Sequence, residues 1–182
     1  DEGMAAIADI LSALEHAHRG GVIHRDVKPS NVIMGSDGRA RLTDFGIAKV
    51  LDTISRPRTQ TGFAATPAYM SPEQASGGKI DHRADLFCAG LVAFEVFTGR
   101  RAYRGGQAAL VHQIIAAPLP ETPELPETLC SWLQTACAKA PEGRFSSARK
   151  MRQALVTIVS QASELAAQVA VTAPSRQPRP PA

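Results

Sequence analysis

The sequence of 182 residues contains few cysteines and no long apolar run. The three cysteines, Cys88, Cys130 and Cys137, are odd in number and lack a metal-ligand spacing such as C-x-x-C. We therefore expect small core residues in a reducing, cytoplasmic compartment. No stretch approaches the roughly 18 apolar residues that span a bilayer, and no basic segment followed by an apolar one opens the chain. The sequence thus predicts neither a signal peptide nor a membrane segment in this stretch.

Neither positive nor negative charge predominates strongly in the sequence. Lysine and arginine number 20 against 17 acidic residues, so the net charge of +3 is a modest excess rather than a basic block. This balance predicts no nucleic-acid partner. With 44% hydrophobic residues, a chain of this length can bury the core of one domain.

The first half of the chain combines one helical pattern with two β-prone pieces. Apolar residues at three-to-four spacing over residues 4–18 predict an amphipathic helix that ends at a Gly-Gly pair. The segments 32–34 and 39–43 are separated by a Gly-Ser-Asp-Gly turn and predict a two-stranded ribbon. Residues 47–70 show no sustained period, which is typical of a long loop.

The second half is predicted to be helical. Residues 85–98 are apolar on nearly every face, which indicates a central helix surrounded by protein. Further helices are expected at 106–116, 127–139 and 146–160. The boundaries predict one domain over 1–160, followed over 161–182 by a helical extension and a Pro-rich disordered linker. Three aromatic side chains are expected in the core: Tyr103, Trp132 and Phe145.

Five short motifs follow one another along the chain. Residues 24–31 read H-R-D-V-K-P-S-N and fit the pattern H-R-D-x-x-x-x-N, and Asp44, Phe45 and Gly46 form a D-F-G triplet that begins 13 residues after Asn31. Three more elements follow in order: Ser71-Pro72-Glu73, Asp85 with Gly90, and Arg144 after Pro-Glu-Gly. Over residues 5–158 this order resembles the C-terminal lobe of bacterial Hanks-type serine/threonine protein kinases. A single Asp or Asn near a strand end usually forms an Asx turn, but the shared order and spacing favour the kinase interpretation.

The resemblance implies a mainly α fold of the protein-kinase C-lobe type. Such a lobe is a helical bundle around a buried central helix, with a small β-ribbon that carries the catalytic and metal-binding loops. It implies ATP-dependent phosphorylation of serine and threonine residues on protein substrates, with ATP and Mg²⁺ as cofactors.

The resemblance also implies roles for particular residues. Asp26 would accept or orient the substrate hydroxyl, and Lys28 would reach the transferred phosphate. Asn31 and Asp44 would hold magnesium against the ATP phosphates, since magnesium prefers oxygen ligands. Ile33 would form the floor of the adenine pocket.

Several further positions would support this site. His24, Phe45 and Gly46 belong to the two loop motifs. Glu73 and Arg144 would form a buried salt bridge, or they are unrelated surface charges. For Asp85 two roles stay open, an N-cap of the central helix and a brace for the backbone of the catalytic loop. His16 and His18 match no motif and are expected to be ordinary surface or packing residues.

The loop 47–70 carries the expected regulatory and substrate-binding residues. Thr59 and Thr61 resemble an autophosphorylation pair of bacterial receptor-type kinases, and Arg25 could receive the phosphate. Two solvated loop threonines are the alternative. Thr66 would bridge Asp26 and Lys28 and help to select serine or threonine acceptors.

Half of a kinase site is missing from the sequence. No two of the 14 glycines stand at i and i+2, so a G-x-G-x-x-G loop is excluded, and all five lysines lie at or after Lys28. We therefore expect a fragment whose partner is an absent N-terminal lobe, inactive alone, and cytoplasmic or the cytoplasmic part of a larger, membrane-anchored kinase. The alternatives are a non-catalytic kinase-like binding or regulatory module, and a small-molecule phosphotransferase with a related loop.

Overall fold

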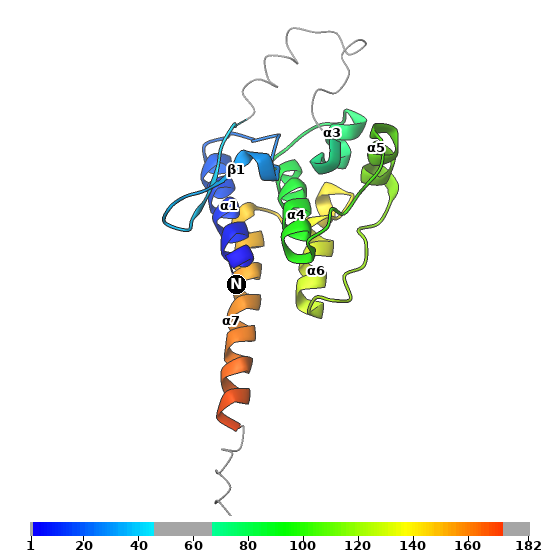
Figure 1. Cartoon of the computed structure of the whole chain (residues 1–182). Coiled ribbons are helices and arrows are strands. Elements are labelled where there is room, and N and C mark those ends of the chain that lie inside the picture. Colours follow the sequence, from blue (N-terminus) through cyan, green and yellow to red (C-terminus); the bar gives the residue numbers. More distant parts are fainter. Residues whose placement is uncertain (1, 46–66, 173–182) are drawn as a thin grey trace, which may run out of the picture.

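The computed structural model describes residues 2–45 and 67–172, with side chains described as far as Glu164. The chain is mainly helical with one two-stranded ribbon, which confirms the predicted fold class (Figure 1). The elements in chain order are α1 (Glu2–Arg19), η1 (Pro29–Asn31), β1 (Val32–Met34), β2 (Ala40–Leu42), η2 (Pro67–Tyr69), α3 (Pro72–Ser76), α4 (Arg83–Thr98), α5 (Gln107–Ala116), α6 (Glu127–Ala136), η3 (Pro141–Gly143) and α7 (Ala148–Thr172).

Helix α1 buries the apolar stripe that its sequence period predicts. The side chains of Ile7, Leu11 and Leu14 are inaccessible to solvent and face α4, α7 and β2. Such burial stabilises the fold by about 1.5–3 kcal/mol per large aliphatic side chain. The helix ends where Gly21 adopts a φ of 74°, a left-handed conformation that costs glycine little.

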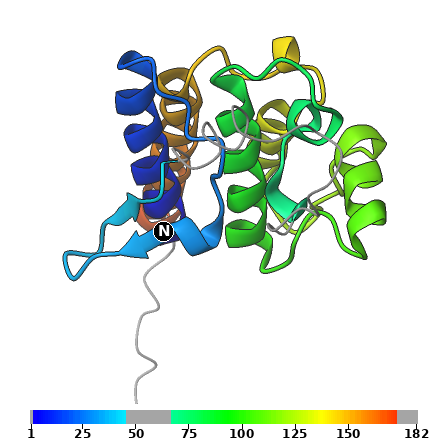
Figure 2. The same ribbon diagram turned by 90° about the horizontal axis from the view of Figure 1, so that it is seen from above.

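Helix α4 is the centre of the lobe, as its continuous apolar sequence predicts. Every residue from Ala84 to Phe94 is buried. Gly90 lies where α4 crosses α6, and a Cβ atom there would come within 2.7 Å of the Cys137 sulfur. The glycine therefore lets the two helices approach more closely than any other residue would. In Figure 2, α4 stands between the α1 and α7 pair and the α5 side of the lobe.

The ribbon between β1 and β2 lies against α1. The strands are antiparallel, with Val32 opposite Leu42 and Met34 opposite Ala40. The predicted hairpin is confirmed, although its second strand is shorter than the predicted 39–43. Asp9 of α1 fixes the ribbon, because its carboxylate accepts hydrogen bonds from the Arg39 guanidinium at 2.6 Å and from the Ala40 backbone N–H at 3.1 Å.

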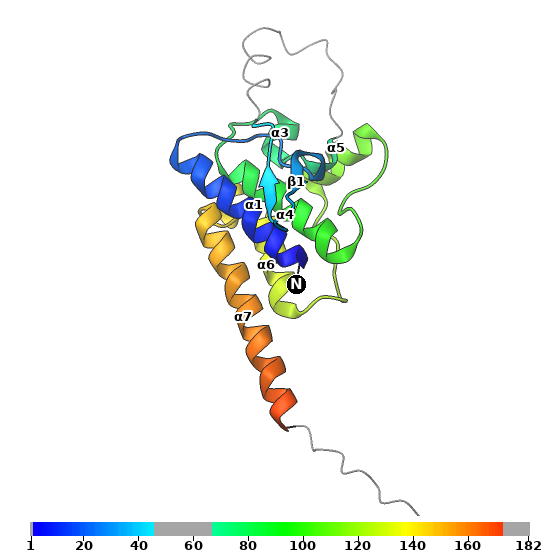
Figure 3. The ribbon, with the colours of Figure 1, turned by 60° about the vertical axis from the view of Figure 1, so that its left-hand side comes forward.

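The last helices differ from prediction at their ends. Helix α6 stops at Ala136 rather than at 139, and α7 starts at Ala148 rather than at 146. Helix α7 runs to Thr172, so a helical extension follows residue 160 as predicted. The long α7 therefore packs against α1 at its beginning and continues past the rest of the lobe (Figure 3). Within the described residues no helix is long and apolar enough to cross a bilayer.

The side chains expected in the core behave largely as predicted. Tyr103 and Trp132 are buried, and Phe145 is partly buried against the same core. Cys88 and Cys137 are buried thiols, and Cys130 is half-buried. Apolar surroundings raise the pKa of the Cys137 thiol to about 12, so it stays protonated and acts as a small core residue.

Candidate active site

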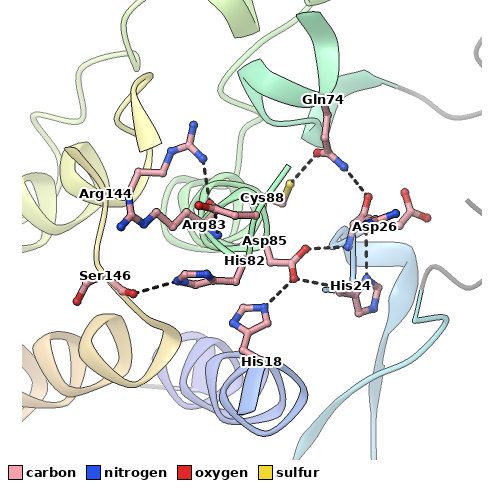
Figure 4. Close-up of polar contacts among 12 residues, drawn as sticks. His18, His24, Asp26, Gln74, His82, Arg83, Asp85, Cys88, Arg144 and Ser146 are labelled. Atoms are coloured by element: carbon pink, nitrogen blue, oxygen red, sulfur yellow. Dashed lines mark hydrogen bonds and ion pairs between the residues drawn. The ribbon is translucent and has the colours of Figure 1, made fainter. Parts of the chain in front are cut away.

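A buried carboxylate holds the backbone of the loop that contains Asp26. Asp85, on the first turn of α4, is inaccessible to solvent, and its two oxygens accept the backbone N–H groups of His24 and Arg25 at 2.8 Å each (Figure 4). The alternative N-cap role is wrong, because the N-cap residue of α4 is His82 and it makes no side-chain cap. Since charge-assisted hydrogen bonds to backbone N–H groups are strong, Asp85 fixes this turn of the loop.

The side chain of His24 connects the same loop to the D-F-G segment. Its Nδ1 accepts the Asp26 backbone N–H at 3.2 Å, so Nε2 carries the ring proton and donates it to the Thr43 carbonyl at 2.9 Å. The Phe45 ring lies 4.5 Å from the imidazole, measured between ring centroids. Because His24 is completely buried, the positions of Asp26 and of the residues after β2 are set together.

Asp26 itself lies between a cation and an amide. Its Oδ2 is 2.8 Å from the Lys28 ammonium and accepts the Asn31 side-chain N–H at 3.2 Å. Asn31 is buried and also donates to the Asp26 backbone carbonyl at 2.8 Å. The Asp26 side chain is still 23% exposed, so the carboxylate is held in one orientation and remains accessible to solvent.

The residues on either side of the ribbon place Asn31 and Asp44 at its same end. The Thr43 N–H and hydroxyl both donate to the Asn31 carbonyl, at 2.9 and 3.2 Å, and Asp44 is the next residue. Asp44 has a φ of 58°, and it is exposed. Ile33 lies on β1 opposite Arg41 and is 55% exposed, an unusual place for a large aliphatic side chain.

Glu73 and Arg144 form a buried ion pair, as the resemblance implies. The guanidinium meets both carboxylate oxygens, at 2.7 and 2.8 Å, and its side chain has no exposed surface. Its remaining N–H groups donate to the carbonyls of Ala138, Arg83 and Lys139 at 2.8 to 2.9 Å. All five donors of the arginine are thus satisfied, which is the condition under which a buried charge is tolerated.

The arrangement of these motifs agrees with the comparison to known families. The family model described as protein kinase domain matches residues 1–156. The chain belongs to the protein kinase family.

Curated kinases from several bacteria are similar to this lobe. The probable serine/threonine-protein kinase PknB of Bifidobacterium longum is 36% identical over 157 residues, which make up 83% of this chain and 23% of the relative. The probable PknB of Lactococcus lactis is 38% identical over 165 residues, or 88% and 26%. PknB of Mycobacterium tuberculosis is 36% identical over 158 residues, or 84% and 25%. The chain spans about a quarter of the length of these relatives.

Kinases of this family generally use ATP with magnesium, and the residues at the end of the ribbon fit such an ion. In the part of the chain that the structure describes, the Asp44 carboxylate has no partner and the Asn31 Oδ1 accepts no hydrogen bond. The described residues contain no cluster of three or more His, Cys, Asp or Glu side chains that would form an all-protein site. One carboxylate and one amide oxygen suit magnesium, which keeps water and phosphate oxygens as its other ligands.

Two residues of this kinase site were missed by the sequence interpretation. His18, expected to be an ordinary surface or packing residue, donates from Nε2 to Asp85 Oδ2 at 2.8 Å (Figure 4). Its ring lies edge-on to that of His82, with centroids 5.5 Å apart. The available signal was its place on α1, because residue 18 continues the buried stripe one turn after Leu14.

Gln74 is the second missed residue. Its side-chain amide donates to the Arg25 carbonyl at 2.7 Å (Figure 4). Its amide oxygen accepts the Ser71 backbone N–H at 2.9 Å. Ser71 and Gln74 form a capping box at the start of α3, and the spacing S-x-x-Q announces such a box in the sequence. The sequence does not indicate the contact of Gln74 with the Arg25 carbonyl, which connects α3 to the loop that contains Asp26.

Four predicted positions lie outside the described residues: Gly46, Thr59, Thr61 and Thr66. Their roles stay predictions.

Proposed function

We propose that this chain is the catalytic and protein-substrate-binding half of an ATP-dependent serine/threonine protein kinase. The observation that carries the proposal is the Asp26 carboxylate, held by Lys28 and Asn31 on a loop whose backbone is fixed by the buried Asp85. Residues 1–160 form this half in the proposal, and 161–182 extend it. The serine/threonine assignment is supported by the relatives, which are named serine/threonine-protein kinases. It is also supported by Lys28, which resembles the lysine of serine/threonine kinases at this place in the loop.

In the proposed reaction Asp26 positions the acceptor hydroxyl and takes its proton. The hydroxyl oxygen bonds to the γ-phosphorus of ATP while the bond from that phosphorus to the β–γ bridging oxygen breaks and ADP leaves. Lys28, already 2.8 Å from Asp26, places a positive charge beside the transferred group. Asn31 and Asp44 would hold Mg²⁺, which neutralises negative charge on the phosphates when it is bound. Ile33 would contact the adenine ring from below.

The proposal includes a small lobe that supplies what the sequence lacks. The glycine-rich loop and its lysine are absent from these 182 residues, yet β1 presents two large apolar side chains to solvent. Ile33 is 55% exposed and Met34 is 56% exposed. Consecutive strand residues point to opposite faces, so the two side chains expose separate apolar surfaces, each available to a covering partner. We propose that a small lobe and the ATP between the lobes cover them, in a cytoplasmic kinase or kinase domain.

The decisive experiment uses a longer protein that joins a small lobe to this chain. Asp26→Asn keeps the size of the side chain but removes the proton acceptor, so phosphate transfer from ATP to a general serine/threonine substrate should fall at least about 100-fold. Thermal unfolding should be unchanged. The control Glu142→Gln makes the same chemical change at an exposed position and should retain full activity. Wild-type activity in Asp26→Asn would remove the assignment.

The second candidate is a non-catalytic kinase-like binding or regulatory module. The same experiment separates the two candidates. If the longer wild-type protein transfers no phosphate and yet captures partner proteins through this lobe, the non-catalytic module is the better description.

A further inference from the structure

A cavity of about 340 Å³ lies beside the segment that follows Thr66. Its walls come from the end of α4, from the connection to α5, and from η2, which packs against both helices. The lining includes Ala68, Glu95, Gly99, Arg100, Arg101 and Arg104. Among the described residues that line this space, three are arginines and one, Glu95, carries a carboxylate.

That carboxylate is already engaged. Glu95 accepts the hydroxyl hydrogen of Tyr69 on η2 and lies 3.7 Å from the Arg101 guanidinium. Arg101 also lies over the Tyr69 ring, 5.7 Å from its centroid. Burial and the neighbouring Glu95 raise the pKa of Tyr69 to about 12, so the phenol stays a hydrogen-bond donor to this carboxylate at every physiological pH. Glu95 therefore balances one of the three positive charges.

The other two arginines keep most of their charge available. Arg100 lies over the Phe94 ring and donates to the Glu121 carbonyl at 2.8 Å, and its contact with the exposed Glu124 is long, at 3.5 Å. Such exposed pairs are weak and are readily exchanged for a better anion.

Arg104 is held in place by its backbone while its charge is left open. Gln113 of α5 accepts from the Arg104 backbone N–H at 3.3 Å and donates to its carbonyl at 2.8 Å. In the described residues the exposed guanidinium makes no ion pair or hydrogen bond. A fixed backbone with an unpaired planar donor group is suited to bidentate binding of a carboxylate or phosphate.

We infer that this arginine pocket, formed by Arg100, Arg101 and Arg104 beside η2, binds an acidic group on the protein substrate near the residue that is phosphorylated. The inference rests on the proposed function, because it takes the adjacent segment after Thr66 as the place where the acceptor chain lies. The bound group is a carboxylate or a phosphate, which share charge and bidentate geometry.

The first test measures peptide binding to the chain by fluorescence anisotropy. A labelled threonine peptide with flanking glutamates should bind at least about fivefold more tightly than the same peptide with glutamines, since each exposed pair contributes only a few-fold. Arg104→Glu should abolish this preference. Arg149→Glu, the same reversal at an exposed position of α7, should retain it. Circular dichroism establishes whether each variant is folded. If Arg104→Glu does not fold, Arg104→Ala replaces it in the test.

Two further arms identify the source of the anion. Phosphoserine in place of glutamate supports a phosphate-bearing substrate if it binds more tightly, and a carboxylate-bearing one if it binds less tightly. Binding of inorganic phosphate with equal affinity for glutamate and glutamine peptides would overturn the inference. Equal affinity for the two peptides without any binding of inorganic phosphate would also overturn the inference.

A kinetic arm keeps this inference distinct from the proposed function. In the longer kinase, kcat/KM for the glutamate peptide should exceed that for the glutamine peptide by about fivefold, and Arg104→Glu should bring the ratio to about one. Equal use of both peptides by the wild type would overturn the arginine pocket and leave the kinase assignment standing. Failure to phosphorylate either peptide, together with intact selective binding, would overturn the kinase assignment instead.

Discussion

Among the single residues that the structure describes, the two non-glycine positions with positive φ both belong to the motifs of the proposed catalytic site. Arg25 has a φ of 65° and Asp44 a φ of 58°. Each such conformation costs of order 1–2 kcal/mol for a residue with a Cβ atom, and neighbours must hold it. Around Arg25 these neighbours are Asp85, which binds its N–H, and Gln74, which binds its carbonyl. The two strained backbone conformations thus lie in the loops that carry Asp26 and Asp44.

Asp44 leads to a prediction about nucleotide binding. In the longer kinase with a small lobe, Asp44→Ala removes an anionic magnesium ligand, so magnesium-dependent affinity for ATP should fall at least about tenfold. Titration calorimetry with and without magnesium measures the effect. Glu142→Ala, which removes an exposed carboxylate on η3, is the matched control and should leave affinity unchanged. Equal magnesium-dependent binding by Asp44→Ala and wild type would contradict the metal role.

Between elements, the buried pair of Glu73 and Arg144 joins α3 to the segment before α7. The guanidinium also lies 4.8 Å from the centroid of the Phe87 ring on α4. Loss of the arginine would leave the Glu73 carboxylate and three backbone carbonyls without their donor in a region that water hardly reaches. Removing one partner of such a pair costs more than the pair itself contributes.

The corresponding prediction concerns stability. Arg144→Ala should lower the free energy of unfolding by about 3–5 kcal/mol, measured by urea denaturation. Arg149→Ala, an arginine truncation at an exposed site of α7, should change it by less than about 0.5 kcal/mol. If the two variants unfold at the same urea concentration, the pair does not stabilise the lobe.

Lys139 joins α5 to the end of α6. Its ammonium donates to the Tyr103 hydroxyl at 2.9 Å and to the carbonyls of Gln113 and Ile114 at 3.2 and 2.6 Å. It thereby donates to two carbonyls at the C-terminal end of α5, where Gln113 also accepts the Ala117 backbone N–H at 2.9 Å. Burial, with the charge of Arg144 acting in the same direction, lowers the pKa of Lys139 to about 8.

This lowered pKa predicts a pH dependence. The unfolded chain keeps the Lys139 proton up to its usual pKa of 10.5, whereas the folded chain releases it near pH 8. Between these values the unfolded state binds more protons, so the contribution of Lys139 to the free energy of unfolding rises with pH. The free energy of unfolding of wild type minus that of Lys139→Met should therefore increase from pH 8 to pH 10. A difference that stays level, as expected for the exposed Lys150→Met, would contradict the lowered pKa.

On the scale of the whole molecule, the ribbon presents an exposed surface within the described residues. Ile33 and Met34 on β1 and Asp44 after β2 are exposed, while α7 packs against α1. A nucleotide on this surface alone would contact only a few side chains. It would lack the small-lobe residues that cover the adenine, the glycine-rich loop over the phosphates and the small-lobe lysine. We therefore expect that this half binds ATP weakly by itself.

The whole-molecule prediction is that residues 1–182 alone transfer no measurable phosphate from radiolabelled ATP to a general protein substrate. The longer protein with a small lobe should be active under the same conditions. Transfer by the short chain that disappears in Asp26→Asn, so that a contaminating kinase is excluded, would show that the small lobe is dispensable.

The sequence by itself determined the family, the elements and the order of the site residues. Local patterns are sufficient for these features, because helical periodicity predicted α1 and the central α4, and a Gly-Ser-Asp-Gly turn predicted the ribbon. The motifs around Asp26 and Asp44 fixed where chemistry should occur. Element ends were less certain, as the end of α6 at Ala136 rather than at 139 shows, because local patterns specify a helix end only to within a few residues.

Only the tertiary structure decided which polar groups meet. His18 and Asp85 lie 67 positions apart, and Gln74 reaches a carbonyl 49 positions away. It also decided that Asp85 braces the loop rather than capping its own helix, and that three arginines after α4 surround one cavity. The physical reason is that a buried or clustered polar group must find a partner or an anion, but its sequence neighbours do not specify which one. Packing of the helices makes that choice.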